Sequence, residues 1–287
     1  MLPVRQRIEA VGGLGVLNPI YDWNPVVTMA LCSALFVGMA WLAAVFLRPR
    51  LAFFLKGQPE LNFSVGYFLS FFNLVDGLLL SLLAVATYQN HANVERIVVR
   101  EAVVLTSLYR DVSTLPDSVR STLQGILHDY TRDIVEVAWP RHRLGETSNS
   151  GTAIMDEFQK QLVAFEPQTR RQEILFEAAF RQFNQYIEAR QLRRVSVRAD
   201  MPAILWYAVG VGIIIHSIFL NCLDIRLRTY LLFATLISLF TATVICMIAL
   251  LDHPFRGPFG VSAEPFAELL DYMLSREELA EGLRQAT

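Results

Sequence analysis

Residues 65–100 read VGYFLSFFNLVDGLLLSLLAVATYQNHANVERIVVR, and this stretch decides the fold. Its first part is apolar enough for a membrane helix, and after Gly77 no glycine or proline interrupts the change into a polar helix. One acid, Asp76, lies within the apolar part. Because a charge in a membrane helix is costly, we expect Asp76 to face protein or water rather than lipid.

Residues four positions apart share one face of a helix, so Leu80, Ala84 and Tyr88 continue the stripe that begins at Asp76. We interpret this stripe as the lining of an aqueous pore. In a symmetric oligomer, Asp76 would form a ring of carboxylates, which favours cations. Leu80 and Ala84 would then form an apolar constriction of the kind that gates by dewetting.

The inner exit of this pore is predicted at Tyr88, Asn90 and His91. Two alternatives stay open. A second stripe fits the period nearly as well and contains Asn73, Gly77, Leu80, Ala84 and Thr87. Asp76 also has a purely structural interpretation, in which it hydrogen-bonds to a neighbouring helix together with Asn73.

The composition supports a membrane protein. Of 287 residues, 53% are hydrophobic and only 18% are charged, which is too apolar for an ordinary soluble domain. The formal net charge of −2 argues against nucleic acid as a partner, because such a partner requires a basic face. We expect membrane lipid, inorganic ions and further copies of the same chain as partners.

Hydropathy and breaks divide the chain into five predicted segments. An interfacial segment precedes two membrane helices, an amphipathic helical domain follows, and two more membrane helices lead to a final loop and amphipathic helix. The segments are 1–25, 26–88, 89–201, 202–251 and 252–287. The predicted fold class is therefore an all-α membrane protein with four transmembrane helices and a helical bundle outside the membrane.

Finer boundaries follow from prolines and turn residues. Arg48-Pro49-Arg50 is expected to stop the first membrane helix, and Trp139-Pro140 is expected to end a helix over 117–138. Four spans place both termini and the middle domain on one side of the membrane. Basic residues are somewhat more numerous near the membrane on that side, which favours the cytoplasm.

No catalytic motif is present. The sequence has no Walker loop, HExxH, GxSxG or Cys/His metal cluster, so we expect neither an enzyme nor a bound metal or cofactor. His216 lies in the third predicted span, where a hydrogen bond to a neighbouring helix is favoured over a role as proton relay.

Several segments carry a resemblance to a known family. Tyr88-Gln89-Asn90-His91-Ala92-Asn93-Val94-Glu95-Arg96 resembles the inner end of the second membrane helix of bacterial bestrophins, with Gln89 in place of a basic residue. The whole chain from about 25 to 275 resembles the bacterial family called bestrophin-like. Its most specific part is LDHPFRG at 251–257, with Asp252, Pro254, Phe255 and Gly257 as the motif.

The resemblance implies a homopentameric ion channel in which the second membrane helix lines the pore. It implies apolar neck positions at Leu80, Ala84 and Tyr88, although Ala84 is smaller than the family pattern. The acidic calcium-binding cluster of animal bestrophins has no counterpart here, so calcium gating is not expected. Asp76 favours cations, and an anion channel of the same architecture is the alternative. A membrane-anchored sensor or interaction protein without a pore is a further alternative, and a transporter is disfavoured because no inverted repeat is apparent.

Overall fold

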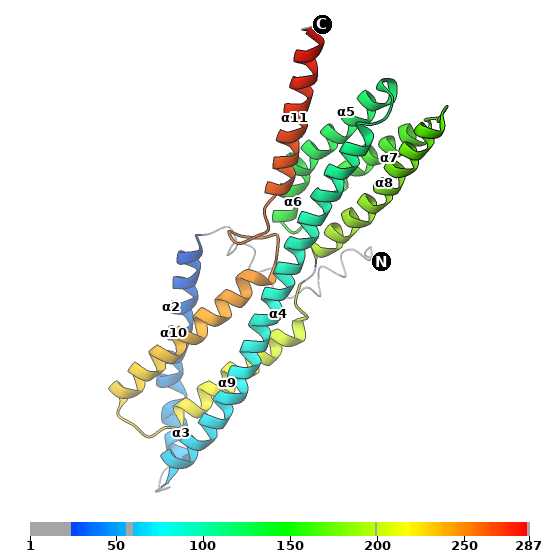
Figure 1. Ribbon diagram of the computed structural model, residues 1–287. Helices are drawn as coiled ribbons and strands as arrows, with labels where there is room; N and C mark the ends of the chain where they lie inside the picture. Colours follow the sequence, from blue (N-terminus) through cyan, green and yellow to red (C-terminus); the bar gives the residue numbers. More distant parts are fainter. Residues whose placement is uncertain (1–23, 56–59, 199, 286–287) are drawn as a thin grey trace, which may run out of the picture. The chain divides into compact units, whose positions relative to one another are not determined.

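The computed structural model describes residues 24–55, 60–198 and 200–285, which contain helices and no strand (Figure 1). The predicted all-α class is confirmed. The predicted interfacial segment 1–25 lies outside the described residues except for its last two. The chain divides into two compact units, one from Met1–Gln89 and Asp200–Asp252, the other from Asn90–Ala199 and His253–Thr287. We call them the membrane unit and the bundle unit.

The membrane unit contains helices that are long and apolar enough to cross a bilayer, and this confirms the predicted four spans. The first span, Pro25–Leu55, contains α2 (Pro25–Phe46) and the short α3 (Arg48–Leu55). The other three are the first part of α4 (Leu61–Val112), α9 (Ala203–Asn221) and α10 (Leu227–Asp252). The start of α2 has the residues that are typical of a helix N-terminus. The side chain of Asn24 accepts a hydrogen bond from the amide of Val26 at 3.0 Å, and Pro25 occupies the first turn.

The first membrane helix α2 ends at Phe46, just before Arg48-Pro49-Arg50 as predicted. A short helix, α3, then begins at Arg48. Pro49 lies in the first turn of α3, where a missing amide hydrogen costs nothing. Near the α9–α10 connection, Asn62 accepts a hydrogen bond from the amide of Asp224 at 2.7 Å and donates one to its carbonyl at 2.9 Å. These bonds tie the start of α4 to the turn between α9 and α10.

The bundle unit contains the second part of α4 and six further helical segments. They are α5 (Asp117–Asp133), the π-helix η2 (Ile134–Ala138), α6 (Trp139–Arg143), α7 (Ser150–Val163), α8 (Arg170–Ser196) and α11 (Glu264–Gln285). Its core is one large cluster of aliphatic and aromatic side chains, in which Phe158, Leu105 and Phe266 are fully buried. The oxygen of Ser262 accepts from the amide of Glu264 at 3.0 Å, as expected for a helix start.

The helix that begins at Asp117 does not end at Trp139-Pro140, so that predicted boundary is wrong. A proline cannot donate to the carbonyl four residues earlier, which would break a regular α-helix at this point. The chain instead widens into the π-helix η2 and continues as α6 to Arg143. The wider turn therefore accommodates Pro140 without ending the helical path.

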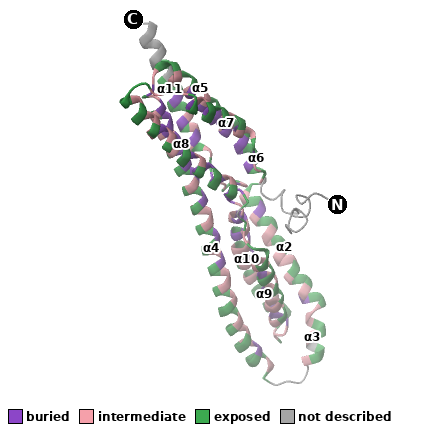
Figure 2. Cartoon of the chain, turned by 90° about the vertical axis from the view of Figure 1, so that its right-hand side faces the viewer, coloured by how far each residue is buried: buried purple, intermediate pink, exposed green. Residues whose placement is uncertain are grey.

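Burial differs between the two units (Figure 2). In the membrane unit, large apolar side chains are exposed along α2 and the first part of α4, for example Leu35, Phe71 and Leu82. A soluble domain rarely exposes so much contiguous apolar surface, whereas lipid covers it without cost. In the bundle unit the large apolar side chains instead face the shared core.

Candidate functional site

The membrane part of α4 packs one face against α9 and α10. Leu83 is buried with Val209 of α9 and Ile248 of α10, and Leu80 and Ala84 are partly buried against the same cluster. The two predicted neck residues therefore lie on the side of α4 that meets helices of the same chain. This placement describes one chain and leaves their role in an assembly as a prediction.

Asp76 lies on this packed face, one turn before Leu80. Its carboxylate occupies the space where a β-carbon on Gly212 of α9 would lie, so Gly212 is the residue that makes room for it. Within the described residues, no hydrogen-bond donor and no ion-pair partner reaches the carboxylate, although the imidazole of His216 acts on it electrostatically. A half-buried acid with so few partners is unusual at this depth and indicates a functional site.

Asn73 links α4 to α9 one turn before Asp76. Its side-chain oxygen lies 2.9 Å from Nδ1 of His216, which confirms the predicted hydrogen bond between His216 and a neighbouring helix. If Nδ1 donates, the neutral ring leaves Nε2 as an acceptor. Nε2 is buried and has no partner among the described residues. In the part of the chain that the structure describes, His216 is therefore held to α4 through Nδ1 alone.

A second face of α4 is uncovered in the chain and carries small and polar residues. We call it the small-residue face. Its members are Gly66, Ser70, Asn73, Gly77, Ser81 and Tyr88. A β-carbon added to Gly66 or Gly77 would meet no atom within 4 Å, and Tyr88 is 63% exposed. Thr87 does not belong to the small-residue face, because it is buried and its hydroxyl donates to the carbonyl of Leu83.

Of the predicted inner exit, Tyr88 belongs to the membrane unit, and Asn90 and His91 belong to the bundle unit. Nε2 of His91 is 2.8 Å from the carbonyl oxygen of Phe259, so His91 holds the segment between α10 and α11. Asn90 is half-buried and also has a partner. These two residues therefore have local structural contacts, and their contribution to an ion path stays a prediction.

Asp252, the first residue of the C-terminal motif, closes the membrane unit. One carboxylate oxygen accepts from the amide of Met201 at 2.9 Å, and the other accepts from Nε1 of Trp206 at 3.2 Å. Asp252 is thereby satisfied at the end of α10 and fixes the start of α9. Its role in the structure is to hold these two helices together.

The rest of the motif folds into the bundle unit. Phe255 is buried and meets the rings of Trp139 and His142 edge-on. Gly257 has φ of 72°, a left-handed conformation that favours glycine, and the amide of Val261 returns to the carbonyl of Pro254 at 2.7 Å. The motif is therefore a compact turn.

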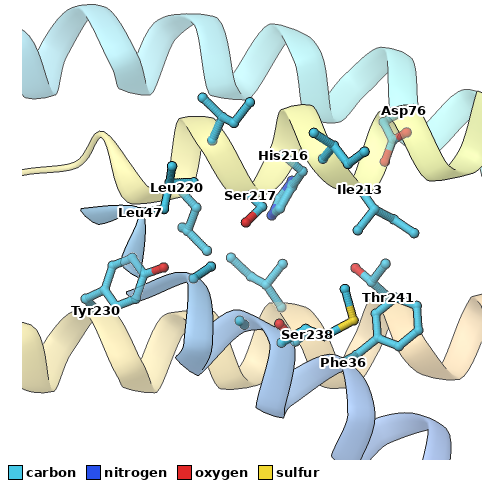
Figure 3. A pocket seen from close by; sticks show the side chains of 16 residues that line it. Phe36, Leu47, Asp76, Ile213, His216, Ser217, Leu220, Tyr230, Ser238 and Thr241 are labelled. Carbon is cyan, nitrogen blue, oxygen red and sulfur yellow. The ribbon is translucent and has the colours of Figure 1, made fainter. Parts of the chain in front are cut away.

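A cavity of about 240 Å³ lies within the membrane unit, between α2, α4, α9 and α10 (Figure 3). Most of its wall is aliphatic or aromatic, with Phe36, Ile213 and Leu220 among the lining side chains. Asp76 and His216 both line it, and hydroxyl groups are contributed by Ser217, Ser238 and Thr241.

The bundle unit contains a buried ionic cluster that sequence patterns did not predict. Arg193 donates through Nε to Glu101 at 2.5 Å, and the two side chains are 3% and 0% exposed. A second nitrogen of Arg193 lies 2.5 Å from Nε2 of His142. Tyr186 contacts Glu101 at 3.3 Å and Tyr130 at 2.5 Å through its hydroxyl. No pattern in the sequence pointed to this cluster, because Glu101 and Arg193 lie 92 residues apart.

Charge balance in this cluster requires a neutral histidine. Burial, with help from the positive charge of Arg193, lowers the pKa of His142 to about 4. Nδ1 lies 3.1 Å from the carbonyl oxygen of Glu146 and donates to it, so Nε2 is left to accept from Arg193. Burial raises the pKa of both Tyr130 and Tyr186, which stay protonated and supply hydroxyl donors.

Comparison with known proteins identifies the family. The Bestrophin-like domain matches residues 29–266, which is most of the chain and spans both units. The chain belongs to the Bestrophin-like family. A search among curated proteins finds none that matches it.

Membership in the Bestrophin-like family, together with the four apolar helices, makes this a membrane protein of channel type. Among the residues that the structure describes, no group of three or more His, Cys, Asp or Glu side chains is placed to hold a metal ion. The site instead consists of a carboxylate, Asp76, and an imidazole, His216, between apolar helices. It suits the binding or passage of a charged species.

Proposed function

We propose that this Bestrophin-like protein is a homopentameric ion channel with α4 at the axis and a preference for cations. The observation that carries the proposal is the small-residue face of α4. Apart from Asn73 at its edge, whose side chain reaches His216 of α9, it stays uncovered in the single chain, whereas α9 and α10 pack mainly on a different side of the same helix. A helix with one face on its own subunit and another left open is suited to line a shared axis.

The chemistry of this face supports the same arrangement. Asn73, Ser70 and Ser81 are exposed at membrane depth, where polar groups in contact with lipid are unfavourable. Gly66 and Gly77 leave space for close approach of another helix. Water in a pore, together with neighbouring copies of α4, would satisfy both properties. The large apolar side chains on the remaining surface of α4, such as Phe71 and Leu82, then face lipid or other helices.

Along the axis the order of residues follows the helix. Asn73 and Asp76 lie toward the outer end, Leu80 and Ala84 lie in the neck, and Tyr88 lies at the inner exit, followed by Asn90 and His91. Leu80 and Ala84 pack on the cluster with Leu83, and the small-residue face runs beside them. Because Ala84 is small, we propose a neck that is wider than one built from large apolar residues.

Asp76 acts on the pore through its field rather than by contact. It lies three residues from Asn73, about 60° around the helix, so the carboxylate is on the flank of the small-residue face. At the low effective dielectric near a membrane interior, a charge several ångströms from an ion path still attracts cations and repels anions. Five such carboxylates around one axis would reinforce each other.

The proposed setting is a bacterial inner membrane, with the bundle unit and both chain ends in the cytoplasm. Membrane lipid would cover the large apolar side chains of α2 and α4 that are exposed in the chain. The test is a flux measurement on purified protein in proteoliposomes. We expect a cation flux that exceeds the anion flux. A protein that passes no ions would contradict the channel proposal, and one that passes chloride preferentially would favour the anion alternative.

A further inference from the structure

The cavity between α2, α4, α9 and α10 has a polar end and an apolar end. Asp76 lies at one end of the lining, near Thr241 and Phe36, whereas Tyr230 and Leu47 lie at the other (Figure 3). His216 and Ser217 lie between them. A ligand that fills this space must therefore combine one polar head with an apolar body.

The polar end calls for a cation. Asp76 is the only carboxylate in the lining, which contains no Lys or Arg. A carboxylate accepts hydrogen bonds, so the group that satisfies it must be a donor. An ammonium group supplies the donors together with the opposite charge.

The apolar end of the cavity determines the size and polarity of the remainder of the ligand. The hydroxyl of Tyr230 is already used, because it donates to the side-chain oxygen of Asn221 at 2.9 Å. Leu47 and Leu220 offer apolar surface, and the ring of Tyr230 closes this end with the guanidinium of Arg48 4.9 Å from its centre. A volume of about 240 Å³ is below the range of roughly 300–1,000 Å³ that accepts drug-sized ligands. The ligand is accordingly a small amine with a short alkyl or aryl body.

We propose that this cavity is a binding site for small apolar organic cations, whose ammonium group pairs with Asp76 and whose apolar body occupies the space toward Tyr230. The site lies inside one chain and needs neither a second copy nor an open pore. It is therefore separate from the proposed ion path, although Asp76 contributes to both.

The test compares two probes that differ in charge. The full chain in lipid nanodiscs is titrated by calorimetry with 2-phenylethylammonium and with 2-phenylethanol, a neutral molecule of nearly the same shape. Empty nanodiscs correct for partition into lipid. We expect saturable binding of the ammonium probe at least tenfold tighter than that of the alcohol. Because no current is measured, a failed binding test leaves the channel proposal to its own experiment.

Two variants distinguish the contribution of the Asp76 charge to binding from that of the cavity volume, and a third variant is the control. Asp76→Asn keeps the size of the side chain and should weaken the ammonium probe to the level of the alcohol, with the alcohol unchanged. Ala43→Phe fills the cavity and should abolish binding of both probes. Ala86→Phe adds the same group on an exposed part of α4 and should change neither affinity. Gel filtration shows which variants keep the assembly of the unchanged protein.

Three results would overturn the proposal. The first is equal affinity of the unchanged protein for both probes, which would mean that an apolar cavity takes lipid-like molecules without regard to charge. The second is an ammonium affinity that Asp76→Asn leaves unchanged. The third is the absence of saturable binding by either probe. Because Asp76→Asn is nearly isosteric, it tests the charge even if Ala43→Phe fails to fold.

Discussion

Gly212 of α9 leaves the space that the carboxylate of Asp76 on α4 occupies. A methyl group at this position would collide with the carboxylate oxygen, which is the end of a flexible side chain and is free to rotate away. The pairing of a glycine with an acid thus holds the charge at one place in the membrane unit. Gly210, two residues earlier on the same helix, has no atom within 4 Å of an added β-carbon and provides a matched control.

Gly212→Ala is therefore expected to displace the charge without unfolding the protein. The rotated side chain costs about 1 kcal/mol, so the melting temperature followed by circular dichroism should fall only slightly. The affinity for 2-phenylethylammonium should fall severalfold, because the carboxylate no longer faces the cavity. Gly210→Ala should leave both quantities unchanged. Equal effects of the two variants would mean that Gly212 does not position Asp76.

Removal of the charge at Asp76 tests the selectivity of the proposed pore. Asp76→Asn should lower the ratio of cation to anion permeability, because five carboxylates near the axis are lost together. The reversal potential across a planar bilayer with a potassium chloride gradient measures this ratio. Asp271→Asn removes an exposed charge of the same kind from α11 and is the control. A reversal potential that Asp76→Asn does not shift would exclude Asp76 from the field along the pore.

The number of copies in the assembly tests the axial position of α4. Native mass spectrometry from mild detergent should give a particle of five chains of 32.5 kDa each. Gly77→Trp should disrupt it, because the small-residue face then cannot approach other copies. Leu82→Trp, on the exposed apolar side of α4, should leave the assembly intact. A monomer as the only species would be incompatible with an axial pore.

The sequence predicted the helices well because their signals are local. Hydropathy marked four spans, and the absence of glycine and proline after Gly77 predicted that the membrane helix continues into a polar helix. The structure has this single helix as α4, which ends at Val112. The end of the first helix before Pro49 was predicted correctly, whereas the boundary at Pro140 was wrong, because the chain accommodates this proline after a π-helix. Proline predicts a disturbance, and the surrounding packing decides whether the helix ends.

The contacts of the site were less predictable because they join distant segments. A period of four placed Asp76, Leu80 and Ala84 on one stripe, but it gives only relative positions around a helix. The orientation of that stripe depends on Gly212 and Val209, more than a hundred residues later.

The ionic cluster of the bundle unit was hidden for the same reason. Glu101 and Arg193 are 92 residues apart, and each falls on an amphipathic helix where a charge normally faces water. Only folding reveals that both are buried.

Breaking this buried pair should destabilise the bundle unit. Glu101→Gln leaves Arg193 charged and without its carboxylate partner, which typically costs about 3–5 kcal/mol. We expect a lower melting temperature and faster hydrogen exchange of the backbone amides of α8. The exposed pair Arg170–Glu173 is the control, and Glu173→Gln should change neither measurement. Equal effects of the two glutamine variants would show that burial of Glu101 is unimportant.

His142 should make the stability of the bundle unit depend on pH. Its pKa is about 4 in the folded protein, against 6.5 for a solvent-exposed histidine, so between these values the unfolded chain binds more protons. The stabilisation from a neutral His142 is therefore complete above pH 6.5 and is lost as the pH falls toward 4. Its full size is about 3 kcal/mol. Melting temperatures between pH 7 and pH 4 should fall more steeply for the unchanged protein than for His142→Gln, whose amide oxygen still accepts from Arg193 but takes up no proton. Parallel curves would mean that the pKa of His142 is the same in the folded and the unfolded protein. The assignment of a neutral His142 to the cluster would then be wrong.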